Sequence, residues 1–160
     1  MGQKVLLNQM PIAIKDSKID ISSEETTKEL AKDLTHYLKG GEIIYLYGEM
    51  GVGKTTFVRH LINQFQKNKK LHITEVTSPT FNLLNEYDIN DLVIKHYDLF
   101  RLKDESEIKN LDLFENNQNT ITLIEWPQLI SKNKSIKTID LIFSYENELN
   151  NRSVEIDGLN

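Results

Sequence analysis

The stretch GEMGVGKTT, Gly48 to Thr56, combines residue types and a spacing that suit the binding of a nucleotide phosphate. Gly48, Gly53, Lys54 and Thr55 occupy the four fixed positions of the pattern GxxxxGK(S/T). Glycines let successive backbone N–H groups point at phosphate oxygens, and a helix that follows adds the positive end of its dipole. The residues predicted to contact the nucleotide along this loop are Glu49, Met50, Gly51, Val52, Gly53, Lys54, Thr55 and Thr56.

Two acidic residues follow apolar runs further along the chain. LVIKHYDL, Leu92 to Leu99, contains Asp98, and TITLI, Thr120 to Ile124, is followed by Glu125. Ligands of open α/β sheets bind at the carboxyl ends of the strands, where such acids can hold Mg²⁺ or orient water. The sequence does not divide these roles between the two acids. The predicted catalytic residues are Lys54, Asp98 and Glu125, and the predicted magnesium ligands are Thr55 and Glu125.

The nucleotide is predicted to be ATP. A GTPase requires an NKxD-type segment that recognises guanine and a DxxG segment, and the sequence contains neither. A kinase for a small molecule usually brings several arginines to the transferred phosphoryl group. This chain has only Arg59, Arg101 and Arg152, which weakens the kinase interpretation but leaves it open. A nucleotide-gated binding module without significant hydrolysis also stays open.

The elements that must position these residues follow from periodicity. Ser22 and Ser23 before two glutamates predict a helix start, and apolar residues at helical spacing extend the pattern until Gly40 and Gly41. EIIYLY, Glu42 to Tyr47, is typical of a strand covered on both faces. A second helix is expected from Lys54 onward, because Phe57, Val58, Leu61, Ile62 and Phe65 recur at helical spacing.

Two further strands are predicted near the C-terminus, at Thr138 to Ser144 and at Arg152 to Ile156. Strands alternating with helices indicate an α/β fold of the P-loop NTPase type, with a largely parallel central sheet flanked by helices. The late pair of strands allows an antiparallel edge. Arg152 is interpreted mainly as a surface arginine of this hairpin, with an approach to the nucleotide as the alternative.

Composition narrows the function further. The 160 residues match one ordinary domain, so residues 1–160 are predicted to form a single ATPase domain. The chain has no cysteine, which excludes disulfides and thiolate chemistry. Its net charge of −5 argues against direct binding of nucleic acid through phosphate neutralisation. No apolar run approaches the ~20 residues that span a bilayer, and we expect a soluble, cytoplasmic protein without a membrane partner.

Three segments that follow the glycine loop in the sequence resemble a known protein family. SPTFNLLNEY (Ser78 to Tyr87), HYDLFRL (His96 to Leu102) and LIEWPQLI (Leu123 to Ile130), in this order, closely resemble the bacterial TsaE family, also called YjeE. Members are small ATPases required for making threonylcarbamoyladenosine in tRNA. The resemblance implies that the chain acts with the TsaB and TsaD proteins, that TsaD transfers the threonylcarbamoyl group, and that tRNA is contacted at most indirectly.

The resemblance also implies roles for individual residues. It makes Thr55 a magnesium ligand, places Glu125 in the metal and water site, and makes Asp98 a further acid there. Ser78 to Thr80 resemble a switch-like loop in which Thr80 senses the γ-phosphate, although the residues alone indicate only a turn at Pro79.

Three more positions are affected by the resemblance. It places Trp126 beside the nucleotide, against the alternative of core packing, and makes Thr27 a base-side contact, against the alternative of a residue in a capped helix. The chain departs from the family at Asp112, where a glycine is expected, and this puts a local turn in doubt.

Overall fold

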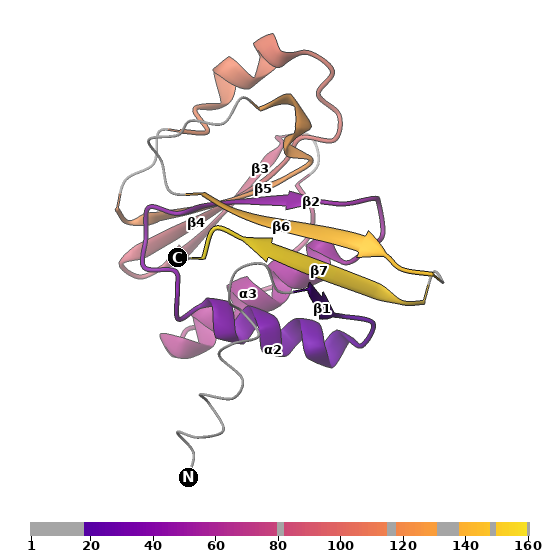
Figure 1. Cartoon of the computed structure of the whole chain (residues 1–160). Coiled ribbons are helices and arrows are strands. Elements are labelled where there is room, and N and C mark those ends of the chain that lie inside the picture. The colour runs from indigo at the N-terminus through magenta and orange to yellow at the C-terminus, as the bar shows by residue number, and fades with distance from the viewer. Residues whose placement is uncertain (1–17, 80–81, 115–117, 131–137, 148–149, 160) are drawn as a thin grey trace.

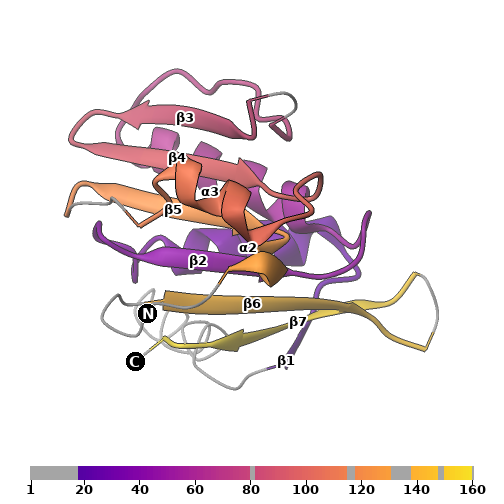
Figure 2. The ribbon, with the colours of Figure 1, turned by 90° about the horizontal axis from the view of Figure 1, so that it is seen from above.

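The computed structural model describes residues 18–79, 82–114, 118–130, 138–147 and 150–159. Within them, one sheet of seven strands has the spatial order β1-β7-β6-β2-β5-β4-β3, which is best followed in Figure 2. The strands are β1 (Lys18–Asp20), β2 (Ile43–Tyr47), β3 (Leu84–Ile89), β4 (Leu92–Asp98), β5 (Thr120–Glu125), β6 (Thr138–Tyr145) and β7 (Arg152–Asp157). The helices are α2 (Glu24–Leu34), α3 (Lys54–Asn68) and the 3₁₀ segments η2 (Glu105–Leu111) and η3 (Pro127–Leu129).

The α/β class is confirmed, but the prediction of a largely parallel sheet is wrong. The pairs β2–β5, β2–β6 and β4–β5 are parallel, whereas β1–β7, β6–β7 and β3–β4 are antiparallel. The sheet is therefore mixed, with four parallel strands in its centre and an antiparallel partner on each side. The physical reason is connection length: a two-residue turn joins β3 to β4, and such a turn permits only antiparallel pairing.

The core lies on both faces of the sheet. The helices α2 and α3 lie side by side beneath one face in Figure 1, where their apolar residues pack on Ile44, Leu46 and Leu123. On the other face Ile43, Tyr45 and Ile124 pack with residues near η2. Successive residues of β2 alternate between these two clusters, as the two-residue period of a strand requires. None of the described helices has the length and the hydropathy that a bilayer crossing requires.

The first helix starts where the sequence predicts it but ends earlier. Ser23 caps α2, because its side-chain oxygen accepts from the N–H of Glu25. The prediction that this helix continues to Gly40 is wrong, since α2 ends at Leu34 and a turn follows. The hydroxyl of Thr35 donates to the carbonyl of Lys32 at 2.6 Å, and this competing bond accompanies the end of the helix.

Two turns depend on residues that tolerate a left-handed backbone. Asn90, in the β3–β4 turn, has φ of 62°, and Asp112, which follows η2, has φ of 51°. Asp112 stands where the resemblance predicts glycine. Aspartate and asparagine adopt this conformation more readily than other residues with a side chain. The departure at position 112 therefore preserves the turn.

Candidate active site

The phosphate-loop motif connects the end of β2 to the start of α3. Gly48 has φ of 145°, and a Cβ added there would lie 2.9 Å from the carbonyl oxygen of Phe143. Gly53 has φ of 119° and directly precedes the first residue of α3. Side chains at these two positions would strain the turn or collide with β6. The sequence expectation of strand, glycine loop and helix in direct succession agrees with this geometry.

Lys54 is held inside the loop. Its side chain is buried, with 4% of the residue exposed, and its ammonium group donates to the carbonyl of Gly48. The same ammonium group lies 3.6 Å from the centre of the Trp126 ring, in a cation–π contact. Burial lowers the pKa of Lys54, while the nearby carboxylates of Glu125 and Asp98 oppose that shift. An anionic ligand in the loop would therefore meet a partly desolvated cation.

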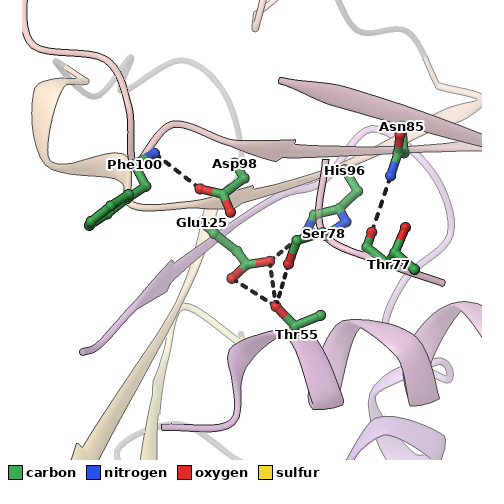
Figure 3. A network of polar contacts seen from close by, with 8 residues as sticks. All are labelled: Thr55, Thr77, Ser78, Asn85, His96, Asp98, Phe100 and Glu125. Carbon is green, nitrogen blue, oxygen red and sulfur yellow. Dashed lines mark hydrogen bonds and ion pairs between the residues drawn. The ribbon is translucent and has the colours of Figure 1, made fainter. Parts of the chain in front are cut away.

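Glu125 forms the centre of a polar cluster next to the start of α3 (Figure 3). The residue is 2% exposed, and one of its carboxylate oxygens lies 2.6 Å from Nε2 of His96. The Thr55 hydroxyl lies 3.3 and 3.4 Å from the two carboxylate oxygens and 3.0 Å from the Ser78 hydroxyl. Side chains from β4, β5, α3 and the loop that contains Ser78 thus meet at the carboxyl end of β5.

Asp98 lies beside Glu125 but in a different environment. The two acids are directly opposite one another in the parallel β4–β5 ladder. Asp98 is only partly buried, and its carboxylate accepts a 3.0 Å hydrogen bond from the N–H of Phe100. Burial raises the pKa of Asp98, and the Glu125 carboxylate adds to that increase. The hydrogen bond from the N–H of Phe100 holds the carboxyl group of Asp98 against its own turn.

A cleft of about 340 Å³ connects the loop with these acids. From the phosphate loop it is lined by Met50, Gly51, Gly53, Lys54, Thr55 and Thr56. From the sheet side it is lined by Asp98, Glu125 and Trp126, which the sequence also predicts as site residues. Residues that are far apart in the sequence therefore converge on one cavity large enough for part of a nucleotide.

The remaining predicted residues lie elsewhere. Glu49 is exposed at the turn of the loop, and the side chain of Val52 packs in the core. Thr27 is 4% exposed in the first turn of α2 and is not among the residues that line the cleft. A contact between Thr27 and the base stays a prediction. Thr80, the predicted γ-phosphate sensor, lies outside the described residues.

Sequence reasoning gave no individual role to His96, Ser78 or Phe100. His96 and Asp98 share one face of β4 because they are two residues apart, and that spacing was the available signal. Phe100 lines the cleft and packs against Trp126, with 4.8 Å between the ring centres. Arg152 is a partly exposed residue of the β6–β7 hairpin and also lines the cleft, and its guanidinium donates to the carbonyl of Ser22 at 3.2 Å.

The oxygens of this site fit magnesium as part of a nucleotide complex. Among the described residues, no group of three or more His, Cys, Asp or Glu side chains is arranged to hold a metal by itself. Mg²⁺ characteristically keeps several waters and takes only one or two protein oxygens together with substrate phosphates. The hydroxyl of Thr55 and the carboxylate of Glu125, at the start of α3 and the end of β5, provide such a pair.

Comparison with known proteins agrees with these observations. Residues 21–154 match the family model described as threonylcarbamoyl adenosine biosynthesis protein TsaE. The chain is 44% identical over 110 residues to a protein of Rickettsia conorii named tRNA threonylcarbamoyladenosine biosynthesis protein TsaE, covering 69% of this chain and 61% of that protein. For the protein of the same name from Bacillus subtilis, identity is 38% over 109 residues, covering 68% and 65%.

A third relative with this name, from Nostoc sp., is 34% identical over 149 residues, covering 90% of this chain and 87% of that protein. Among solved structures, YdiB of Bacillus subtilis shares the fold, with a TM-score of 0.62 at 24% identity, covering 89% of this chain and 85% of that one. The family match spans the phosphate loop, both acids, β6 and the first residues of β7. On this evidence, the chain belongs to the TsaE family.

Proposed function

We propose that this chain is an ATPase with a P-loop NTPase-like fold that binds and hydrolyses MgATP in tRNA threonylcarbamoyladenosine biosynthesis. One observation carries the proposal: Lys54, Thr55 and Glu125 converge on a single cleft at the carboxyl end of parallel strands. The names of the relatives from Rickettsia conorii and Bacillus subtilis supply the pathway. The proposed partners are TsaB and TsaD, the TsaD protein being the one that transfers the threonylcarbamoyl group.

The residues of the cleft have distinct proposed tasks. The N–H groups of the glycine loop and the ammonium group of Lys54 bind the phosphates of ATP. Thr55 and Glu125 would hold Mg²⁺, which would offset negative charge on the phosphoryl oxygens. Glu125 or Asp98 orients a water molecule, whose oxygen bonds to the γ-phosphorus as the bond to the β–γ bridging oxygen breaks and whose proton passes to a phosphate oxygen or to solvent. ADP and inorganic phosphate leave as products.

Weak turnover of the isolated chain follows from the same site. Among the described residues, Arg152 is the one arginine that lines the cleft, and its guanidinium already donates to Ser22. Phosphoryl transfer depends strongly on cations that stabilise the transition state. A partner protein that brings a further positive charge to the cleft would raise the rate of ATP hydrolysis. The same argument makes the chain a poor candidate for a self-sufficient small-molecule kinase.

Phosphate release from MgATP tests the proposal, measured for the chain alone and with TsaB and TsaD. The Lys54→Ala variant serves as the blank, and Lys67→Ala, which removes an exposed lysine at the other end of α3, serves as the matched control. Turnover is expected to rise with the two partners, to disappear in Lys54→Ala and to persist in Lys67→Ala. If the wild type stays at the level of the blank in both conditions, hydrolysis is not the function.

Two further readouts separate the alternatives. Transfer of the γ-phosphate to an added metabolite instead of water would establish a kinase. Partner binding that depends on ATP, with turnover at background, would establish a nucleotide-gated binding module. Both are measurable with the same protein preparation.

A further inference from the structure

His96 is the most completely buried polar residue that contacts the site. The residue is 0% exposed, and Nε2 of the imidazole lies 2.6 Å from one carboxylate oxygen of Glu125. The other ring nitrogen, Nδ1, is buried and has no hydrogen-bond partner among the described residues. An unpaired buried nitrogen destabilises the fold, so a leucine would suit the core better if packing were the only demand at this position.

The strand register explains how His96 reaches Glu125. In the parallel β4–β5 ladder His96 is opposite Leu123, and Asp98 is opposite Glu125. His96 and Glu125 therefore share the face of the sheet that carries α3, and they meet diagonally across the two strands. His96 lies one step deeper than the acids, on the core side of Glu125. Figure 3 shows the imidazole of His96 above the carboxylate of Glu125 and Thr55 below it.

The hydrogen bonds to Glu125 differ in length. The bond from His96 is short, at 2.6 Å, whereas the hydroxyl of Thr55 lies at 3.3 and 3.4 Å from the two oxygens. A carboxylate without a proton only accepts, so we assign the hydrogen of this bond to Nε2 of His96. Lys54, which also lines the cleft, directs its ammonium group to the carbonyl of Gly48. Among the described contacts, His96 is thus the closest donor to this buried carboxylate.

We propose that His96 is a positioning residue: its Nε2–H fixes the Glu125 carboxylate in the direction of Thr55, so that the two magnesium-ligating oxygens are in place before nucleotide binds. This inference rests on the proposed function. Groups that orient a metal ligand from behind typically change metal affinity by about 10-fold to 100-fold when they are removed. His96 acts through Glu125 and touches neither phosphate nor magnesium.

Calorimetric titration of the full chain with ADP, once with Mg²⁺ and once with EDTA, tests this role without relying on turnover. His96→Leu removes the donor, and His96→Gln keeps an N–H donor at a similar distance from the backbone. Thr122→Val is the matched control, because the Thr122 hydroxyl is also buried and unpaired but lies on the other face of β5. It is expected to bind ADP like the wild type in both conditions.

His96→Leu is expected to weaken ADP binding at least about tenfold with Mg²⁺ and less than about twofold with EDTA. His96→Gln is expected to recover most of the loss. Equal weakening in both conditions, or no recovery in His96→Gln, would assign His96 a merely structural role and overturn the proposal.

If His96→Leu does not fold, a variant with a shorter amide side chain at position 96 provides a second test. His96→Asn places its amide about one bond length short of Glu125, while His96→Gln reaches it. The proposal requires His96→Gln to bind ADP with Mg²⁺ more tightly than His96→Asn does, and equal affinities contradict it. If the ADP affinity of the wild type does not depend on Mg²⁺, the proposed function is overturned as well. If Mg²⁺ strengthens ADP binding in the wild type and equally in His96→Leu, only the proposed role of His96 is overturned.

Discussion

The carboxyl ends of β4 and β5 lie side by side and each carries an acid, yet the two ends are built differently. At the end of β5, Glu125 is 2% exposed and faces His96, Thr55 and, beyond it, Ser78. At the end of β4, Asp98 is partly exposed and accepts from the backbone of its own turn. One acid is therefore held by side chains from other elements, and the other is held by its own segment.

This difference suggests different roles for the two acids in the proposed reaction. A carboxylate fixed by several partners keeps its direction when a ligand binds, and preorganised charge is the main source of catalytic stabilisation. A carboxylate at a turn adapts more easily and is exposed to the incoming ligand. For the proposed hydrolysis, we therefore expect the dominant effect from Glu125 and a secondary effect from Asp98. Substitutions of Glu125, Asp98 and Phe100 test this ranking.

The largest effect is expected from Glu125→Gln. The substitution keeps the shape of the side chain but removes its charge and changes its bond with His96. The rate of ATP hydrolysis with the partner proteins is expected to fall about a thousandfold, within the range for removal of a positioned acid–base group. The measurement is steady-state phosphate release. A loss smaller than that of Asp98→Asn would reverse the proposed ranking.

Asp98→Asn is expected to lower the same rate about tenfold, because it removes one charge at the margin of the cleft. The amide oxygen still accepts from the N–H of Phe100, so the turn itself is preserved. The Michaelis constant and the maximal rate should be measured separately. A fall of the maximal rate as large as that in Glu125→Gln would show that both acids are equally essential.

Asp98→Asn is also expected to stabilise the ligand-free chain by about 1 kcal/mol at neutral pH. Burial raises the pKa of Asp98 above its ordinary value of 3.8, so the charged form is disfavoured in the folded state. The wild-type chain therefore has its full stability contribution from Asp98 below 3.8 and loses it as the pH rises through the raised pKa. The advantage of the variant should appear over the same interval.

Urea unfolding in EDTA between pH 4 and pH 7.5 measures this advantage. Asp88→Asn is the control, since Asp88 is an exposed aspartate of the edge strand β3. Its stability should follow that of the wild type across the interval. A stability difference for Asp98→Asn that grows toward acidic pH would contradict the assigned direction of the pKa.

The smallest effect is expected from Phe100→Leu, at the exposed end of β4. Phe100 is 51% exposed and packs on Trp126 with 4.8 Å between the ring centres. Loss of one aromatic contact is expected to destabilise the chain by about 0.5 kcal/mol, the lower end of the range for such pairs. Trp126 is the only tryptophan, so its fluorescence during urea unfolding reports the change. A loss above about 2 kcal/mol would mean that this end is as constrained as Glu125.

Much of the site could be predicted from the sequence because its signals are local. The glycine pattern, the helix that starts at Lys54 and the acid that ends β5 each arise from a few neighbouring residues. Predicted strand limits differ from the observed ones by a single residue at β4, β5, β6 and β7. The hairpin strand β3 was not predicted, since its residues alternate only weakly between buried and exposed positions.

The amino-acid sequence by itself determined the phosphate-loop motif and the family resemblance, because these depend on the order and spacing of neighbouring residues. The sequence also placed an acid at the end of each of two strands. Only the tertiary structure decided which acid is buried, because the partners of Glu125 are His96 from β4 and Thr55 from α3, far apart in the chain. Burial and hydrogen bonding between distant residues depend on strand register and packing, and no local pattern contains them.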